Sequence, residues 1–236
     1  MLDLLIQQNN YFRFRKVSPE DYKDYMLPLW ILQEIPDKSS NILDYGCGFG
    51  QTLAALKKAG FTNIYGVDIE KSAISYCIKE GYNVKELNSD NLKNPFPIKF
   101  DVILLLHVLE HIPKNMIINT LRIIKEDFLA DNGKLLIAVP NAQSNTGCYW
   151  AYEDWTHTTL FTSGSIYYVL KAAGFEKVEF LDIDCTLGRS KLKSIIRKFF
   201  LKIYKITKSF WNKITCSAYH PHFPQIFSYE IKLKAQ

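Results

Sequence analysis

The 236-residue sequence predicts an α/β fold in which helices cover both faces of a largely parallel sheet. Two short runs, 102–106 and 135–139, are apolar at every position, as expected of strands that are buried on both faces. Three further segments place a glycine and then an aromatic residue after a lysine-containing turn, which indicates helices that end just before strands: 57–61, 79–82 and 171–175. Strands therefore alternate with helices over the first two thirds of the chain.

A helical region is predicted before the sheet. Ser18 is a favourable N-cap and Pro19 a favourable first helical residue, so an amphipathic helix should run from there toward Ile35. The predicted strands are 41–45, 64–67, 83–86, 101–106, 134–139 and 177–184, with an alternating run over 227–234 as the last. We predict a single domain made of a helical cap (1–40), a core (41–185), a basic amphipathic helical segment (189–214) and a final strand (225–236).

The composition excludes a disordered chain and disfavours a membrane-spanning one. Hydrophobic residues make up 47% of the chain, yet no uncharged apolar stretch approaches the ~20 residues that a spanning helix needs. The first residues lack the features of a secretory signal, and the five cysteines are scattered without a Cys-x-x-Cys pair. We therefore expect reduced thiols and a cytoplasmic protein.

The net charge of +5 is the sum of two unlike parts. Residues 1–188 carry 18 Lys and Arg against 23 Asp and Glu, a net −5, whereas residues 189–236 carry 11 against 1, a net +10. The acidic part suits a positively charged ligand, and the basic part suits an anionic acceptor or surface. No nucleic-acid recognition motif accompanies the basic part, so we do not expect a nucleic-acid partner.

A glycine-rich loop follows the first strand, at the sheet edge where open α/β proteins bind ligands. Gly46–Gly50 has glycine at alternate positions, which matches neither the dinucleotide fingerprint nor a P-loop. Asp44, just before the loop, would repel a pyrophosphate and attract an ammonium group. Asp68 follows the second strand, 22 positions beyond the first glycine, where an acid can bind both hydroxyls of a ribose. Asp90, after the third strand, is placed to accept a purine amino proton.

This pattern resembles the class I S-adenosylmethionine-dependent methyltransferases over about residues 42–185, through Leu43-Asp44-x-Gly46-x-Gly48-x-Gly50, Val67-Asp68 and Phe100-Asp101-Val102-Ile103 followed by 107–113. The resemblance implies a Rossmann-like, doubly wound sheet of seven strands, mostly parallel with the last antiparallel, and S-adenosyl-L-methionine as cofactor. By the same resemblance the loop and Asp44 hold the methionine part. The cofactor residues it predicts are Asp44, Gly46, Cys47, Gly48, Gly50, Asp68, Ile69, Asp90, Asn91, Leu106 and His107.

The segment after the fifth strand carries the predicted chemistry. Its Asp-x-Thr-His…Phe-Thr pattern is similar to methyltransferases of bacterial surface-polysaccharide clusters, which implies a glycan or sugar-linked acceptor. An alcohol must lose a proton on methylation, so we predict His157 as the base, with Asp154 and His111 as further catalytic residues. The alternative is that His157 pins the loop to the core with Asp154 as its partner. The aromatic residues predicted to contact the acceptor are Tyr149, Trp150, Tyr152 and Trp155.

His107, Glu110 and His111 form an inverted zincin pattern and would share one face if the segment were helical. A protease is not expected beside a nucleotide-type site. Some O-methyltransferases that act on RNA ends or quinone precursors carry Glu-x-x-Glu-His and bind a divalent metal, but here His107 replaces the first Glu. A metal held by these residues with His157 is an alternative; we expect no metal, and residues that line the cofactor pocket and bond to one another.

The sequence therefore predicts O-methylation of a hydroxyl on a sugar or surface-polysaccharide precursor. The alternatives are an N-methyltransferase, a small-metabolite O-methyltransferase and a non-catalytic cofactor-binding partner subunit; the oligomeric state is left open. For the basic segment we favour a helix that packs on the domain between the sixth and seventh strands and leaves its cationic face in solvent, because the returning last strand ties the segment into the sheet. The alternative is an interfacial helix on anionic lipid, which would place the protein peripherally at the inner membrane face.

Overall fold

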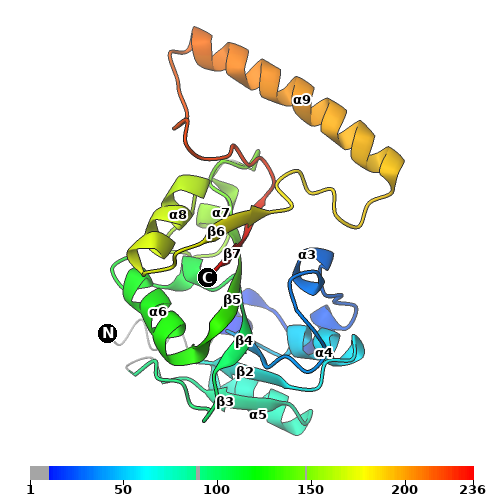
Figure 1. The fold of residues 1–236 in the computed structure, drawn as a ribbon, viewed down its shortest axis with the longest axis vertical. Coiled ribbons are helices and arrows are strands. Elements are labelled where there is room, and N and C mark those ends of the chain that lie inside the picture. Colours follow the sequence, from blue (N-terminus) through cyan, green and yellow to red (C-terminus); the bar gives the residue numbers. More distant parts are fainter. Residues whose placement is uncertain (1–10, 89–90, 147) are drawn as a thin grey trace.

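The computed structural model of the chain describes residues 11–88, 91–146 and 148–236 (Figure 1). Its centre is a seven-stranded sheet in the order β3-β2-β1-β4-β5-β7-β6, in which β7 runs antiparallel to both of its neighbours. The predicted fold class is therefore confirmed. The strands are β1 (Ile42–Tyr45), β2 (Ile64–Asp68), β3 (Asn83–Glu86), β4 (Phe100–Leu106), β5 (Leu129–Pro140), β6 (Val178–Leu181) and β7 (Glu230–Ala235).

Helices connect these strands, and three of them end as the sequence predicts. Gly60, Gly81 and Gly174 follow α4, α5 and α8 with φ of 87°, 77° and 97°, the left-handed conformation that ends a helix. The helices and helical turns are α2 (Tyr11–Arg15), η1 (Pro19–Tyr22), α3 (Leu29–Leu32), α4 (Gln51–Lys58), α5 (Lys71–Lys79), η2 (Leu109–His111), α6 (Ile117–Ile123), η3 (Ile124–Phe128), α7 (Tyr149–Tyr152), α8 (Ser163–Ala172) and α9 (Lys191–Ile214).

The predicted long helix from Ser18 toward Ile35 is wrong. The chain forms the short turn η1, straightens, and makes one further helical turn, α3. Pro28 explains the break, because it lacks a backbone N–H and disfavours a helical conformation in the residue before it. The apolar face is still buried, since Trp30 and Ile31 pack under the sheet.

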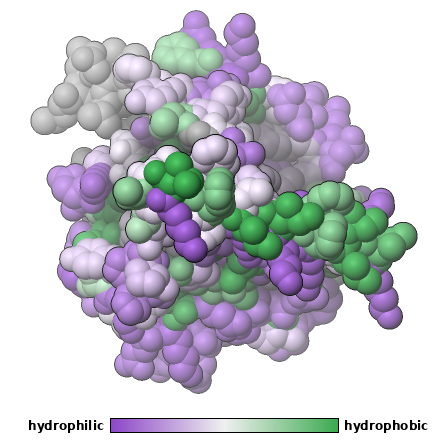
Figure 2. Space-filling view, turned by 90° about the horizontal axis from the view of Figure 1, so that it is seen from above, coloured by the Kyte–Doolittle hydropathy of each residue, from purple (hydrophilic) through white to green (hydrophobic). Residues whose placement is uncertain are grey.

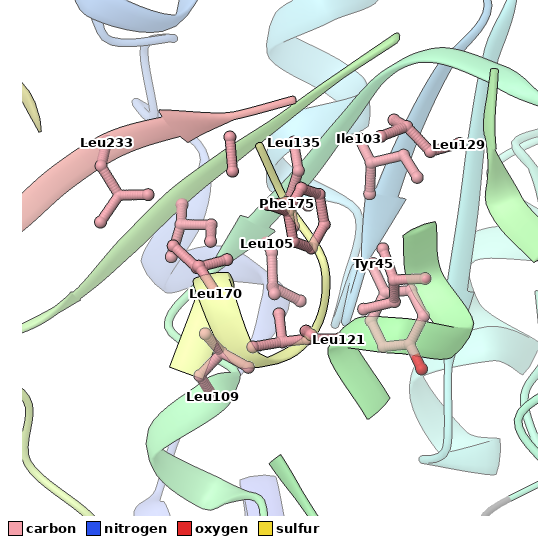
Figure 3. Close-up of a cluster of buried hydrophobic side chains, with 14 of the residues drawn as sticks. Tyr45, Ile103, Leu105, Leu109, Leu121, Leu129, Leu135, Leu170, Phe175 and Leu233 are labelled. Atoms are coloured by element: carbon pink, nitrogen blue, oxygen red, sulfur yellow. The ribbon is translucent and has the colours of Figure 1, made fainter. Parts of the chain in front are cut away.

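The two faces of the sheet each carry a hydrophobic cluster, because successive strand residues point to opposite sides. Ile103 and Leu105 of β4 pack with α6 and α8 on one face (Figure 3). Val102 and Leu104 pack with α3 and α4 on the other face. This burial on both faces explains the unbroken apolar runs in β4 and β5. The parallel pairing of β1, β2, β4 and β5 brings their carboxyl ends to one edge of the sheet.

The end of β6 also departs from prediction, since the strand stops at Leu181 rather than at residue 184. Asp182 and Cys185 adopt positive φ values of 42° and 50°, which a strand does not accommodate. All five cysteines lie in the described part of the chain and are free thiols there. Within the described residues, no helix has both the length and the apolar character needed to cross a membrane.

Candidate active site at the carboxyl edge of the sheet

The glycine loop after β1 turns sharply at each of its three glycines. Gly46, Gly48 and Gly50 have φ of 84°, 50° and 79°, where side chains are strained. At Gly46 a Cβ atom would lie 2.5 Å from Cγ2 of Val108, so the loop also needs glycine to pass beside the end of β4. The loop is thus closely packed against the end of β4.

Asp44 lies directly under this loop and is 2% exposed. Its Oδ2 atom has no hydrogen-bond partner among the described residues. Burial, and then the nearby Asp68 carboxylate, raise the pKa of Asp44 to about 7, although a hydrogen bond with Thr52 acts in the opposite direction. A buried, unsatisfied carboxylate oxygen is costly, and an ammonium group would satisfy it.

Asp68 at the end of β2 fixes the loop from the neighbouring strand. Its Oδ2 accepts the Gly48 N–H at 2.8 Å, and its Oδ1 accepts the Glu70 N–H at 2.9 Å. Burial raises the pKa of Asp68, and these backbone hydrogen bonds lower it in part. Because each carboxylate oxygen has two lone pairs, both oxygens retain the capacity to accept a ribose hydroxyl.

The other predicted cofactor residues fall into distinct environments. Ile69 is 41% exposed beside Asp68, where an apolar side chain can contact a purine ring. Cys47 is fully buried against α5, so its side chain faces the core and leaves only its backbone toward the loop. Leu106 is half-buried at the end of β4, Asn91 is exposed, and Asp90 lies outside the described residues.

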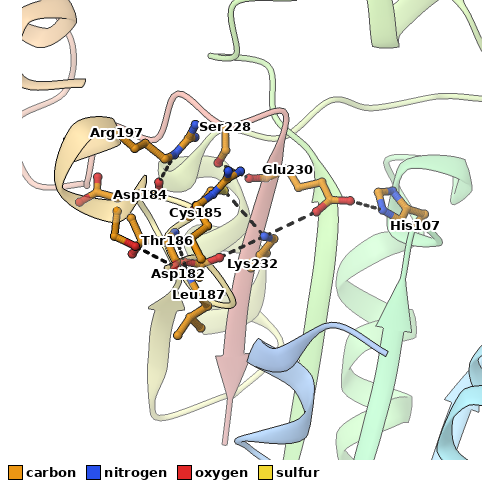
Figure 4. Close-up of polar contacts among 12 residues, drawn as sticks. His107, Asp182, Asp184, Cys185, Thr186, Leu187, Arg197, Ser228, Glu230 and Lys232 are labelled. Atoms are coloured by element: carbon orange, nitrogen blue, oxygen red, sulfur yellow. Dashed lines mark hydrogen bonds and ion pairs between the residues drawn. The ribbon is translucent and has the colours of Figure 1, made fainter. Parts of the chain in front are cut away.

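His107 directly follows β4 and has a φ of 55°, so the helical face considered for His107 and His111 does not form. Its Nε2 atom lies 2.9 Å from Oε1 of Glu230 (Figure 4). Its Nδ1 atom lies 3.3 Å from Oε1 of Glu110. Burial opposes a charge on the ring, but the two carboxylates outweigh it and raise the pKa of His107 to about 10. His107 is therefore an imidazolium at neutral pH and offers no lone pair.

His111 has a defined tautomer because of the residues behind it. Its Nδ1 atom is 2.8 Å from Oγ1 of Thr156, which in turn donates its proton to Oδ1 of Asp154 at 2.7 Å. Thr156 can then only accept from His111, so Nδ1 carries the proton and Nε2 carries the lone pair. Burial lowers the pKa of His111, although Glu110 and Asp154 act against this. His111 is thus a neutral base at physiological pH.

His157 is oriented by a different contact. Its Nδ1 atom is bound to the carbonyl oxygen of Trp150, which can only accept, so the lone pair again lies on Nε2. The His157 and His111 rings are 4.7 Å apart between centroids. His157 Nε2 is 3.9 Å from Oδ2 of Asp154, too far for a hydrogen bond. Asp154 is thus within ion-pair distance of His157, but the closer contact of the ring is the Trp150 carbonyl.

Asp154 instead ties the N-terminal helix α2 to the loop after β5. The carboxylate is 3% exposed and accepts the Tyr11 hydroxyl at 3.0 Å, while Nε of Arg15 lies 3.3 Å from the same Oδ2. Sequence reasoning missed Tyr11 and Arg15, because these contacts span more than a hundred residues and no local motif marks them. Asp154 acts here through Thr156 and α2, which makes it a positioning residue.

Helix α2 also covers the glycine loop. The ring of Phe12 lies over Gly48, where a Cβ atom would be 3.3 Å from its Cζ, and stacks on Phe49 at 4.4 Å between centroids. Tyr11 meets the His111 ring edge-on at 5.5 Å. One short helix therefore spans the glycine loop and the histidine pair.

We expect Phe12→Ala to speed dissociation of S-adenosylhomocysteine by about ten-fold, because it removes one aromatic stacking contact over the loop. Stopped-flow displacement measures this rate. Phe14→Ala is the matched control, since Phe14 is on the same helix but 62% exposed. Equal dissociation rates for the two variants would show that α2 does not cover bound ligand.

The predicted acceptor-contacting residues lie on α7 and just after it. Tyr149, Tyr152 and Trp155 are 52%, 77% and 82% exposed, which leaves their rings free to stack on a ligand. Trp150 differs: it is half-buried, packs 6.3 Å from Tyr229 between ring centroids, and holds His157 through its carbonyl. Three of the four aromatic residues are thus exposed on the segment that carries His157, and the fourth holds His157 in place.

Glu110, His111 and His157 bring one potential metal-ligand atom each within 4.8 Å of one another. Glu110 is fully buried, and neither carboxylate oxygen has a hydrogen-bond partner among the described residues. Its nearest cation is His107, which pairs with both Glu110 and Glu230, whereas Lys232 lies 4.0 Å from Glu230 and 3.4 Å from Asp182. His107 therefore supplies a positive charge beside Glu110 without a metal ion.

Chelation is consequently expected to leave turnover unchanged, since the His111 and His157 lone pairs remain available as bases. The measurement is turnover after dialysis against EDTA, followed by addition of single divalent metals. Loss of activity that one metal restores would assign the two histidines and Glu110 as ligands instead.

Comparison with known proteins agrees with this geometry. The family described as "Methyltransferase domain" matches residues 11–180. A SAM-dependent methyltransferase from Archaeoglobus fulgidus has a TM-score of 0.61 and 21% identity, with 98% of each chain covered. Magnesium protoporphyrin IX methyltransferase (ChlM) from Synechocystis PCC 6803, solved with bound SAH, has a TM-score of 0.52 and 15% identity, with 88% of this chain and 78% of that chain covered.

Curated relatives match over a shorter stretch. The ubiquinone biosynthesis O-methyltransferase of Pseudomonas fluorescens is 29% identical over 90 residues, 36% of this chain, and the chain spans only 38% of that relative's length. The chain belongs to the methyltransferase-domain family and is an S-adenosylmethionine-dependent methyltransferase. The predicted enzyme class and cofactor are thereby confirmed.

The residues fit this cofactor, which supplies a methyl group on a positively charged sulfonium. Asp44 offers the unsatisfied oxygen for its ammonium group, and Asp68 offers lone pairs for the ribose hydroxyls. Gly48, between them, lies beneath the Phe12 ring.

Proposed function

We propose that this enzyme methylates a hydroxyl group on a sugar or surface-polysaccharide precursor. The observation that carries the proposal is the pair of oriented histidine rings, with His111 held by Thr156 and His157 held by the Trp150 carbonyl. A hydroxyl must lose its proton during methyl transfer, whereas a neutral amine already presents a lone pair. Two oriented bases therefore favour an oxygen acceptor over nitrogen.

The open aromatic surface supports a ring-shaped acceptor. Tyr149, Tyr152 and Trp155 project from the loop that also carries His157, so a stacked ring would lie near the bases. Aromatic side chains stack well on the apolar faces of sugars, and the hydroxyls at the ring edge would then face the two lone pairs. The combination of base and stacking surface thus supports this acceptor class.

The test is a screen with methyl-labelled S-adenosylmethionine against sugar nucleotides, glycan precursors, catechols and amines. We expect label in sugar hydroxyls. Label in amines alone would contradict the proposal, as would label in none of the acceptors by a protein that binds S-adenosylhomocysteine.

A phenolic small metabolite is the second candidate, because the curated relatives are O-methyltransferases of ubiquinone biosynthesis. A phenol has a pKa near ~10 and needs less help from a base than a sugar alcohol does. Methylation of catechols but not of sugars in the same screen would select this candidate.

A further inference from the structure

Helix α9 stands apart from the rest of the molecule. It has 24 residues, which corresponds to a length of about 36 Å. All of its residues are described and none of them is buried. In Figure 1 it extends from the domain between β6 and β7 as an arm. The expectation of a helix packed on the domain through its apolar side is therefore wrong.

The side of α9 that faces the protein is its polar side. Arg197 Nε donates to the carbonyl oxygen of Asp184 at 2.6 Å, and Lys205 lies 3.5 Å from the Asp184 carboxylate (Figure 4 shows Arg197 and Asp184). The Tyr204 hydroxyl donates to Oδ1 of Asn145 at 2.9 Å. The half-buried positions recur every three or four residues on this side, among them Ser194, Arg197, Leu201, Tyr204, Lys208 and Asn212.

The opposite side carries the apolar residues, and it faces outward. Ten large apolar side chains of α9 are between 43% and 67% exposed. Viewed from the α9 side of the molecule, green apolar atoms form a band along the helix (Figure 2). Surface helices of globular proteins normally bury this face, so its outward orientation indicates a partner. Members of the stripe include Leu192, Ile195, Phe199, Phe200, Ile206 and Phe210.

The charge of α9 indicates that this partner is anionic. The helix carries eight Lys and Arg and no Asp or Glu. On a helical projection Lys191, Lys198 and Lys202 border one edge of the apolar stripe, where long side chains can reach lipid phosphates. A second copy of α9 would bring two cationic helices together, which is unfavourable. RNA would match the charge and leave the apolar stripe in water.

A hollow on the helix shows the same pairing of charge and apolar surface. Arg189, Lys193 and Arg197 line it together with Ile196 and Phe200, and its volume is about 430 Å³. Cationic and apolar side chains that meet in one hollow suit a phosphate head group and the start of an acyl chain. The hollow is therefore amphipathic, as the whole helix is, and it is lined by residues that could hold a single lipid.

We infer that α9 is a membrane-docking helix that lies in the surface of a bilayer containing anionic phospholipid, with its apolar stripe between the acyl chains. The hydrogen bond from Tyr204 to Asn145 joins α9 to the segment between β5 and α7. Docking would therefore hold the aromatic acceptor surface close to the bilayer. Docking does not depend on which acceptor the enzyme methylates. It can be measured as binding to vesicles, without an activity assay.

The test is sedimentation of the full chain with phosphatidylcholine vesicles that contain about one third phosphatidylglycerol, at low salt. We expect binding to these vesicles, weaker binding at high salt, and at least about ten-fold weaker binding to pure phosphatidylcholine. Phe199→Glu should lower partitioning by about ten-fold or more relative to Ser209→Glu, which adds the same charge outside the apolar stripe. S-adenosylhomocysteine binding by both variants verifies that they are folded.

Three results would overturn the inference. The first is no sedimentation with the anionic vesicles, and the second is equal loss in the two variants. The third is concentration-dependent dimerisation in analytical ultracentrifugation that Phe199→Glu abolishes while vesicles bind neither protein, which would assign the stripe to a second copy of the chain.

Discussion

His111→Ala is expected to lower turnover by a factor of about 10² to 10⁴ and to leave the affinity for S-adenosylhomocysteine unchanged. The reason is that Nε2 of His111 carries the lone pair that the acceptor proton needs, whereas the cofactor contacts come from Asp44 and Asp68. Single-turnover kinetics with labelled donor measure the chemical step, and calorimetry measures the affinity. His222→Ala is the control, because His222 is exposed in the segment before β7.

The residues behind the base give a second readout. Thr156→Val removes the hydroxyl that accepts from His111 Nδ1, so the ring loses its fixed tautomer and kcat should fall with little change in KM. Thr156→Ser should restore it. Burial lowers the pKa of His111, so the wild-type rate should stay level down to a pH below ~6.5. Full activity in both His111→Ala and His157→Ala would remove histidine from the proposed chemistry.

The sequence predicted those parts of the site that local chemistry determines. Asp44, the glycine loop and Asp68 lie at the ends of two strands. Because those strands are parallel, their carboxyl ends meet at one edge of the sheet. The contacts of Asp154 with Tyr11 and Arg15 were not predictable, because they join segments whose separation in sequence carries no pattern.

For helix α9, the sequence predicts the helix but not which of its faces meets the domain. The helical spacing of its apolar residues correctly predicts a helix with one apolar face, since that property depends only on the periodicity of the sequence. The face that meets the domain depends on the positions of Asp184 and Asn145, which bind polar residues of the helix. Periodicity alone therefore assigned the apolar face to the core, whereas tertiary hydrogen bonds turn it outward.

Asp44→Asn is expected to weaken S-adenosylhomocysteine binding by about ten-fold to a hundred-fold, because an amide cannot neutralise the ligand's ammonium group. Asp131→Asn is the matched control, since Asp131 is exposed near the start of β5, away from the loop. The same variant is also expected to change the stability of the ligand-free protein, in the direction opposite to its effect on ligand affinity. A buried Asp44 whose pKa is about 7 binds its proton more tightly in the native than in the unfolded state.

Stability of the ligand-free protein should therefore fall as pH rises from about 4 to about 7, with a total cost of roughly 4 kcal/mol, and Asp44→Asn should raise Tm at neutral pH. Ligand affinity has the opposite pH dependence. Only ionised Asp44 attracts the ammonium group, so affinity should rise by up to about ten-fold per pH unit below pH 7 and then level off. Calorimetry across this range, in buffers of different ionisation enthalpy, detects the released proton. A slope that persists in Asp44→Asn would place the titrating group elsewhere.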